Sequence, residues 1–326
     1  MRDGRLHRRV LITGGLGFLG SHLALRLVEE GAHVTIVDRP EPLADYQRDN
    51  LADLAHRADV QFCDVCDTAR LAPLLSGQDV VFWLAAQVSH LDSMRRPLAD
   101  LDINYRSLLA ALEHCRHQGL RPRFVFASTR QVYGRPESLP VTEQHPVQPV
   151  DVNGVHKAAA EQALRLYAEV HGLPTVSLRL TNCYGPRMDL DDPEKGVAGV
   201  LIGRATRGEP LTLFGGDQRR DFNHVDHVVA ALLLAGEGEG LSGRCFNLGH
   251  PQPCTLREFA ATLGRLTGTR VEAAPFPPER KAIDIGSCYC DFSAFTRATG
   301  WRPQLDLETG LQRTLSEMPR PSLRRY

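Results

Sequence analysis

Short runs of apolar residues alternate along the first half of the chain with longer segments in which apolar residues recur every three or four positions. The short runs predict strands buried on both faces, since such strands lack polar alternation. They are Val10–Thr13, Val34–Val37, Val60–Phe62, Val80–Leu84, Phe124–Ala127 and Thr175–Leu180. The periodic segments predict helices from Leu19 to Glu30, over Leu101–Gln118 and over Gly154–His171. Strands that alternate with helices pair in parallel through crossovers, so we expect an α/β fold with a doubly wound parallel sheet.

Beyond Asn182 this alternation becomes irregular. A helix over Val225–Leu234 and a strand over Cys245–Leu248 still fit the main sheet. We therefore assign residues 8–182 and about 218–249 to a main domain, and residues 183–217 and 250–318 to a smaller C-terminal lobe. Ligands of open α/β sheets bind outside the carboxyl ends of the strands, so we expect the working site between these two parts.

Composition excludes several classes of protein. Among 326 residues, 38 are Lys or Arg and 39 are Asp or Glu, which leaves no general positive charge for nucleic acid. No apolar run is long enough to span a membrane, and the first residues do not lead into a signal-peptide core, so we expect a cytoplasmic protein. Eight cysteines are too few for a disulfide scaffold, and no histidine pair accompanies them, so we expect no metal site.

A glycine-rich segment joins the first strand to the first helix: Thr13-Gly14-Gly15-Leu16-Gly17-Phe18-Leu19-Gly20. Gly14, Gly17 and Gly20 suit a tight turn, close approach of the backbone to a pyrophosphate, and close packing of helix on strand. The helix N-terminus that follows offers N–H groups to phosphates. Asp38 ends the second strand, where a carboxylate accepts hydrogen bonds from a ribose 2′-hydroxyl and repels a 2′-phosphate. The segment therefore predicts NAD rather than NADP, a preference that the neighbouring Arg39 weakens slightly.

Further motifs follow the predicted strands in order. They are Asp64-Val65, Leu84-Ala85-Ala86-Gln87, Ser128-Thr129…Val132-Tyr133-Gly134, Arg179-Leu-Thr-Asn182-Cys-Tyr-Gly-Pro-Arg187, Gly215-Gly-Asp-Gln-Arg-Arg220-Asp-Phe222 and Gly300-Trp301-Arg-Pro303. Together with the glycine loop, this series resembles the extended short-chain dehydrogenase/reductase family, whose members act on nucleotide sugars. The resemblance covers residues 8 to about 315 and is more specific for the family than for the reaction. It implies a Rossmann-like NAD-binding domain, a C-terminal lobe that binds the nucleotide sugar, and a homodimer formed through the two long helices.

The resemblance also implies roles for individual residues. Asp64 and Val65 would contact adenine. The rest of the dinucleotide would lie along the glycine loop, including Phe18 and Leu19, and along Leu84, Ala85, Ala86 and Gln87. Thr129 matches the residue that hydrogen-bonds the reacting sugar hydroxyl, and Lys157 matches the lysine that holds the nicotinamide ribose. On the substrate side it implies Ser89, His90, Arg130, Asn182, Arg220 and Arg280. Asn182 and Arg220 would lie at the diphosphate, and either Arg280 or Lys281 would supply a second charge.

The chain departs from the family at the catalytic helix. There the family has Tyr-x-x-x-Lys, and this chain has Asn153-Gly-Val-His-Lys157. An amide cannot carry a proton as a phenolate does, so Asn153 can only position a hydroxyl or a water. Three explanations remain open. His90, oriented by Asp92, takes over as the base; a tyrosine from elsewhere, Tyr133 or Tyr184, points inward; or the protein binds NAD and a ligand without turnover.

Neighbouring residues limit these alternatives. His156 is expected to face away from Asn153. Arg130-Gln131 stands where dehydratases of the family carry an acidic pair, so 4,6-dehydration is not expected. Cys183 fits a small buried filler better than a catalytic thiol.

The expectation is therefore an NAD-dependent epimerase. It would act on a nucleotide-activated sugar through a transient keto intermediate, with C4 the commonest position in the family that it resembles. The alternatives are a non-catalytic protein that binds NAD and a nucleotide sugar, or a dehydrogenase or unusual dehydratase acting on the same substrates.

Overall fold

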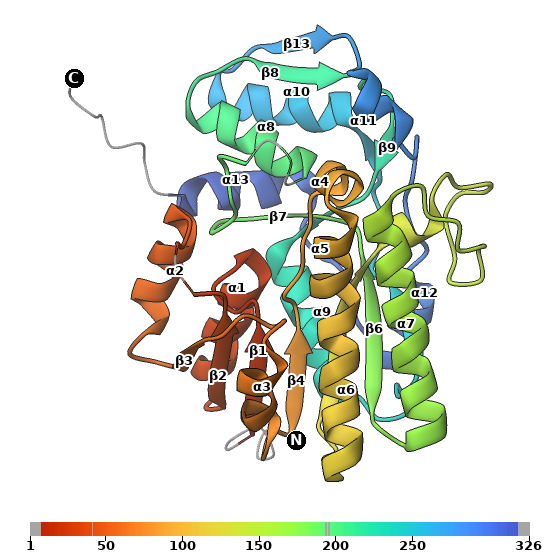
Figure 1. The fold of residues 1–326 in the computed structure, drawn as a ribbon. Helices are drawn as coiled ribbons and strands as arrows, with labels where there is room; N and C mark the ends of the chain where they lie inside the picture. Colours follow the sequence, from red (N-terminus) through yellow and green to blue (C-terminus); the bar gives the residue numbers. More distant parts are fainter. Residues whose placement is uncertain (1–7, 41, 193, 195, 319–326) are drawn as a thin grey trace.

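The computed structural model describes residues 8–40, 42–192, 194 and 196–318, and its centre is a parallel sheet of seven strands (Figure 1). Across the sheet the order is β11-β6-β5-β4-β1-β2-β3. The strands are β1 (Arg9–Thr13), β2 (His33–Asp38), β3 (Asp59–Phe62), β4 (Val80–Trp83), β5 (Arg123–Thr129), β6 (Thr175–Leu180) and β11 (Arg244–Asn247). The predicted doubly wound sheet is confirmed, and all seven carboxyl ends meet at one edge because every neighbouring pair is parallel.

Helices cover both faces of the sheet because successive side chains of each strand point to opposite sides. On one face, Val10 and Ile12 of β1 pack under α1 (Phe18–Glu29) and α9 (Val225–Glu237). On the other, Leu11 packs under α6 (Ser107–Gln118) and α7 (Val152–His171). The remaining helices of this part are α2 (Asp45–Leu54), α3 (Thr68–Leu71), α4 (His90–Arg95), α5 (Pro97–Leu101) and α12 (Ser293–Thr299), with 3-10 turns at Ala72–Leu75 and Arg130–Tyr133.

A smaller lobe lies beyond the carboxyl ends of the strands, at the top of Figure 1. Its helices are α8 (Val197–Thr206), α10 (Leu256–Thr267), α11 (Pro278–Ala282) and α13 (Leu307–Glu317). Three short strand pairs accompany them: β8 (Leu211–Phe214) with β13 (Val271–Ala274), β7 (Asn182–Tyr184) with β10 (Phe222–His224), and β9 (Arg219–Arg220) with β12 (Cys254–Thr255). Tyr184, Phe259 and Leu311 belong to the separate apolar core of this lobe. The predicted smaller lobe is therefore present, while the domain boundaries given above stay a prediction.

The main differences from the predicted elements lie before α6. The predicted helix over Leu101–Gln118 is α5, then one turn of π-helix over Asp102–Arg106, then α6. The sequence pattern also missed α4, which is only six residues long, too short for apolar periodicity to reveal. No helix within the described ranges is both long enough and apolar enough to cross a membrane.

A buried polar network anchors α7 to the sheet. Arg179 of β6 and Glu161 of α7 form an ion pair at 2.6 Å with both side chains almost fully buried. The guanidinium also donates to the hydroxyl of Tyr133 at 2.6 Å, and that hydroxyl donates to Asn247 of β11 at 2.8 Å. Ser128 of β5 donates to Glu161 as well. The network therefore holds α7, β5, β6 and β11 together.

Replacing Arg179 by Met is expected to lower the free energy of unfolding by about 3–5 kcal/mol, because it leaves the Glu161 carboxylate buried without its counter-charge. The matched control is Arg165→Met on the exposed side of α7, where Arg165 pairs with Glu169 at the surface. The control is expected to change stability by less than about 1 kcal/mol. Urea denaturation measures both values, and equal losses would contradict the role given to the buried pair.

Candidate active site

The glycine loop is shaped for the close approach of a phosphate. Gly14 has φ +70°, and a Cβ there would press on the backbone of Ala85. A Cβ at Gly20 would overlap the carbonyl oxygen of Gly14. Gly17 caps α1 without a side chain, and α1 opens with Phe18 and Leu19. The N–H groups of its first turn therefore have no capping side chain and suit the binding of an anion.

Asp38 lies beside this loop at the carboxyl end of β2, and its carboxylate is held in place. One oxygen accepts from the N–H of Leu16 at 2.8 Å, and the other accepts from the N–H of Arg39 at 2.9 Å. Burial raises the pKa of Asp38 above its ordinary value, although both N–H groups oppose this. The side chain of Arg39 is exposed. The glycine turn, the uncapped helix and the oriented carboxylate fit the diphosphate and adenosine ribose of NAD.

The other residues expected along the dinucleotide follow β3 and β4. Asp64 is exposed, and its carboxylate accepts from the N–H of Cys66; Val65 is buried. Leu84, Ala85, Ala86 and Gln87 are partly exposed. The N–H groups of Leu84 and Ala85 donate to Thr13 at 3.2 Å, which joins this segment to the glycine loop.

Lys157 is buried on α7, and its ammonium group is held against β5. The ammonium donates to the carbonyl of Ala127 at 2.9 Å and lies 4.5 Å from the centre of the Phe126 ring. Burial lowers its pKa from 10.5 to about 8, although the charges of Asp100 and Glu161 oppose the shift. Lys157 is therefore a cation that loses its proton far more easily than an exposed lysine.

Asn153 is buried one turn before Lys157, and its amide is used to join three segments. Its Nδ2 donates to the carbonyl of Gln87 at 2.7 Å and to Asp100 of α5 at 3.3 Å. His156 contacts the same carboxylate, with Nδ1 2.7 Å from Asp100. The expectation that His156 faces away from Asn153 is therefore wrong. Residues three apart on a helix lie on neighbouring parts of its surface, so one carboxylate reaches both.

His90 opens α4 and lies close to a carboxylate that the sequence did not indicate. Its Nδ1 is 3.0 Å from Asp151, whose side chain is fully buried, while 36% of the His90 side chain stays exposed. Burial would raise the pKa of Asp151, but the contact with His90 and hydrogen bonds from Gly154 and Gln131 lower it overall. His90 and Asp151 thus form a histidine–aspartate pair with an accessible imidazole.

Asp92 does not orient His90, as had been expected. It accepts from the guanidinium of Arg96 at 2.8 Å and also from the side chain of Gln87. Residues two apart on a helix point to different sides, which separates Asp92 from His90.

The position of Asp151 at the N-cap of α7 can be predicted from the sequence. Its pairing with His90, which lies 61 residues earlier in the chain, follows only from the fold.

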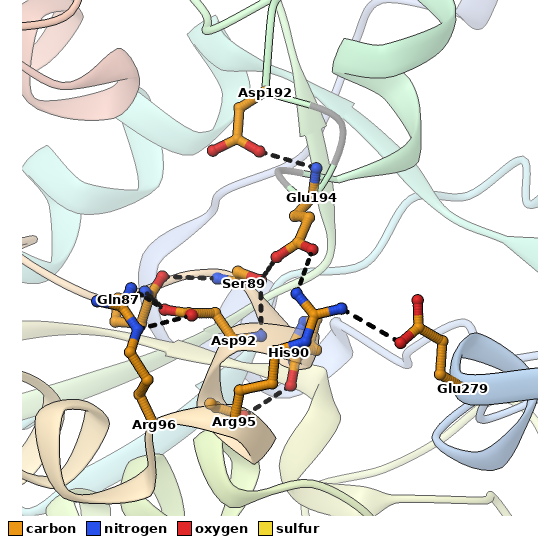
Figure 2. Close-up of polar contacts among 10 residues, drawn as sticks. Gln87, Ser89, His90, Asp92, Arg95, Arg96, Asp192, Glu194 and Glu279 are labelled. Carbon is orange, nitrogen blue, oxygen red and sulfur yellow. Dashed lines mark hydrogen bonds and ion pairs between the residues drawn. The ribbon is translucent and has the colours of Figure 1, made fainter.

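Charged contacts tie α4 to the smaller lobe (Figure 2). Ser89 caps α4 and donates from Oγ to Glu194 at 2.6 Å. Arg95, at the other end of α4, reaches Glu194 at 3.0 Å and Glu279 of α11 at 3.2 Å. The helix that carries His90 is therefore held by two parts of the lobe that are distant in sequence.

The remaining substrate-side residues lie on β5, β7, β9 and α11. Thr129 ends β5, and its hydroxyl accepts from the N–H of Gln131 at 3.2 Å. Asn182 donates to the carbonyl of Asp221 at 2.9 Å. Arg220 is buried, donates to the carbonyl of Gly286, and lies 3.5 Å from Asp284. Arg280, on α11, stacks at 6.0 Å over Phe214, and Arg130 directly follows Thr129.

Both tyrosines considered as alternative bases are buried and have structural roles. The Tyr133 hydroxyl is buried between Arg179 and Asn247, and Tyr184 is buried in the core of the smaller lobe. Burial raises the pKa of each. Burial likewise raises the pKa of the Cys183 thiol. None of the three is prepared for proton transfer.

Comparison with known proteins agrees with this geometry. Residues 10–249 match the model of the NAD dependent epimerase/dehydratase family. The chain belongs to this family. It is 31% identical over 313 residues to a putative UDP-glucose 4-epimerase of Methanocaldococcus jannaschii, covering 95% of this chain and 98% of that protein. NAD is therefore the cofactor of this chain.

Solved structures of family members superpose over nearly the whole chain. A UDP-glucose 4-epimerase of Thermotoga maritima, solved with UDP-glucose, has a TM-score of 0.86 and 31% identity, covering 94% of this chain and 97% of that one. A UDP-glucuronic acid 4-epimerase of Bacillus cereus, solved with UDP-glucuronic acid and NAD, has a TM-score of 0.84 and 27% identity, covering 94% and 98%. The chain is thus an NAD-dependent enzyme of the nucleotide-sugar epimerase/dehydratase type.

The lowered pKa of Lys157 predicts a pH dependence of stability. Between its folded pKa of about 8 and its ordinary value of 10.5, the unfolded chain binds more protons than the folded one, so this residue makes stability rise with pH in that window. Lys157→Met is expected to remove that rise, and Lys281→Met, at an exposed lysine of α11, to keep it. Denaturant titrations from pH 7.5 to about 10.5 measure it. If the free energy of unfolding changes with pH in the same way in wild type and in Lys157→Met, the lowered pKa of Lys157 is contradicted.

Proposed function

We propose that this protein is an NAD-dependent 4-epimerase of a UDP-activated sugar in which the His90–Asp151 pair takes over the acid–base role. The pair carries the proposal because it places a histidine within 3.0 Å of a buried carboxylate at the start of α7. The similarity to UDP-sugar 4-epimerases supports the substrate class and the position of reaction. The glycine loop and Asp38 support the cofactor.

The glycine loop and Asp38 would hold NAD, which would supply the hydride transfer from the sugar carbon and back to it. Thr129 accepts or donates a hydrogen bond at the reacting hydroxyl. His90 removes the hydroxyl proton as the carbonyl forms, and the negative charge of Asp151 stabilises the resulting imidazolium. His90 then returns the same proton to the oxygen after the keto sugar has turned its other face. One group thus serves as base and as acid, and no net oxidant or proton is consumed.

Lys157 and Asn153 support this chemistry from α7. The Lys157 ammonium, held by Ala127 and Phe126, would donate to a ribose hydroxyl of the nicotinamide nucleotide. Asn153 and Asp100 keep α7 and α5 at a fixed spacing from the segment after β4. In this proposal Asn153 positions the residues around it and does not touch the proton that is transferred.

The absence of acidic residues at Arg130-Gln131 favours epimerisation over dehydration. Loss of water from a keto sugar needs an acid at the leaving hydroxyl and a base at the neighbouring carbon. Arg130 is a permanent cation, and Gln131 donates its amide to Asp151 at 3.0 Å. Neither supplies a proton at neutral pH.

His90→Ala is expected to lower the turnover number by about 10²–10⁴. The test incubates the NAD-loaded protein with UDP-glucose or UDP-glucuronic acid and follows the C4 epimer by sugar NMR. Added imidazole is expected to restore part of the rate to the alanine variant, an effect that a merely structural histidine would not show. His117→Ala, on α6, is the control with an unchanged rate.

Two results would contradict the proposal in different ways. Full turnover by His90→Ala would show that the histidine takes no part in the reaction, while the assignment as an epimerase would stand. If the NAD-loaded protein formed no product from any UDP-sugar, the alternative of a non-catalytic protein that binds NAD and a nucleotide sugar would be favoured. In that case Lys157→Ala would alter only cofactor occupancy.

We further infer a homodimer formed through α7. Three large apolar residues lie on one side of this helix and are 46–66% exposed: Val155, Leu166 and Val170. Several exposed apolar side chains on one face are typical of a surface that binds another protein chain. A second copy of the same face would bury them around a two-fold axis.

Val170→Glu, which adds a charge at the most exposed position of that face, is expected to convert the dimer to a monomer in analytical ultracentrifugation. Glu169→Gln, beside it, should leave the dimer intact. A wild-type protein that sediments as a monomer would contradict this inference.

A further inference from the structure

Helix α2 buries two amide side chains on its inner face. Gln47 and Asn50 are 6% and 1% exposed, and residues three apart on a helix lie on neighbouring parts of its surface. Amides are mostly exposed in proteins, and a buried one needs hydrogen-bond partners to offset the loss of water. Gln47 donates to the Asp38 carboxylate at 3.5 Å and accepts from the N–H of Ala44 at 3.2 Å. The amide of Asn50 reaches the glycine loop itself.

Asn50 joins two segments that are far apart in the chain. Its Nδ2 donates to the carbonyl of Leu16 at 2.9 Å, and its Oδ1 accepts from the guanidinium of Arg187 at 3.0 Å. A carbonyl can only accept and a guanidinium can only donate, so the amide fits in one orientation alone. Asn50 is therefore held between the glycine loop and the segment that follows β7.

The backbone of Leu16 is held on both sides. Its N–H donates to Asp38 at 2.8 Å, and its carbonyl accepts from Asn50. The next N–H, that of Gly17, donates to the carbonyl of Gly14 at 3.0 Å. The C=O and the N–H of the peptide bond between Leu16 and Gly17 are thus both fixed. This peptide bond lies immediately before the first turn of α1, which no side chain caps.

Arg187 is itself held in place from several directions. Its φ is +64°, and no other non-glycine residue of the described ranges has a positive φ. Such a conformation persists only where the surrounding contacts hold it. The guanidinium also donates to Asp53 of α2, and the carbonyl of the preceding Pro186 accepts from Nε2 of His22, on α1, at 3.0 Å. The segment after β7 therefore contacts both α1 and α2.

We propose that Asn50 is a positioning residue for the cofactor, which fixes the peptide of Leu16 and is itself fixed by Arg187. The N–H groups of the first turn of α1 then keep one geometry for the diphosphate of NAD. Backbone donors that are already oriented bind an anion without a further loss of conformational freedom, which strengthens binding and slows release. Of the proposed function, this role rests only on the placement of NAD at the glycine loop and not on the epimerase reaction.

A purely structural role for Asn50 makes a different prediction. Support of α2 alone would lower the free energy of unfolding and leave the affinity of the folded protein for its ligands unchanged. The proposed role concerns the turn that binds phosphate. It therefore affects NAD and ADP, which carry a diphosphate, and spares adenosine, which carries no phosphate.

The experiment follows the release of NAD from the NAD-loaded full chain, by exchange against isotopically labelled NAD. Asn50→Asp keeps the size of the side chain and the acceptor for Arg187, but it sets a carboxylate oxygen against the carbonyl of Leu16. It is expected to raise the release rate at least about tenfold. Arg187→Met leaves the bond between Asn50 and Leu16 in place and is expected to raise the rate about threefold. Arg187→Lys should retain most of the wild-type behaviour, since it keeps a donor and the charge.

Competition by ADP and by adenosine against labelled NAD separates the phosphate turn from the rest of the site. Asn50→Asp is expected to weaken the competition by ADP about tenfold and to leave that by adenosine within about twofold. The matched control is Ala52→Asp, which adds the same charge at an exposed position of α2 and is expected to behave as wild type. Urea denaturation confirms that each variant is folded. If Asn50→Asp fails to fold, Arg187→Met carries the test, because its side chain is partly exposed.

An unchanged release rate in Asn50→Asp, or equal losses for ADP and adenosine, would overturn the proposal. An equal effect of Ala52→Asp would assign the change to long-range charge and overturn it as well. Gly17→Ala, which sets a methyl group 3.1 Å from the carbonyl oxygen of Gly14, tests the placement of NAD separately. If it speeds release and Asn50→Asp does not, only the role of Asn50 is lost. If neither variant speeds release, the placement of NAD at the glycine loop fails.

Discussion

The position of α7 is the constraint on which the site depends, and the buried ion pair between Glu161 and Arg179 sets it. Two charges removed from water are tolerated because each has further partners, Ser128 for the carboxylate and Tyr133 for the guanidinium. Lys157 lies one turn before Glu161 on the same face of α7, and Asn153 lies one turn earlier. The same attachment therefore sets where the ammonium meets β5 and where the helix begins.

The beginning of α7 gathers several buried polar contacts. Asp151 caps the helix through the N–H of Gly154 and also meets His90, so one carboxylate performs a structural and an electrostatic task. Asn153 and His156 share Asp100, which closes α5 against α7. The amide of Asn153 thus joins α7 to α5 and to the segment after β4. The histidine whose side chain stays partly exposed here is His90.

Electrostatics divides the site into two parts. Carboxylates gather near two groups: Asp151 near His90, and Asp100 and Glu161 near the Lys157 ammonium. The charges of two arginines, Arg130 and Arg220, lie near each other in the other part. Helix α4, which carries His90, is attached to the smaller lobe through Arg95.

The sequence by itself determined the alternation of strands and helices, the glycine turn, Asp38 at the end of β2 and Lys157 on the long helix. These are local signals: each depends on spacing within a few residues, or on the rule that parallel strands end at one edge. Only the tertiary structure decided which groups meet. It replaced Asp92 by Asp151 as the partner of His90, and it brought His156 to Asp100. Such contacts join residues far apart in the chain, and their geometry follows from how helices pack on the sheet, which spacing along one element does not encode.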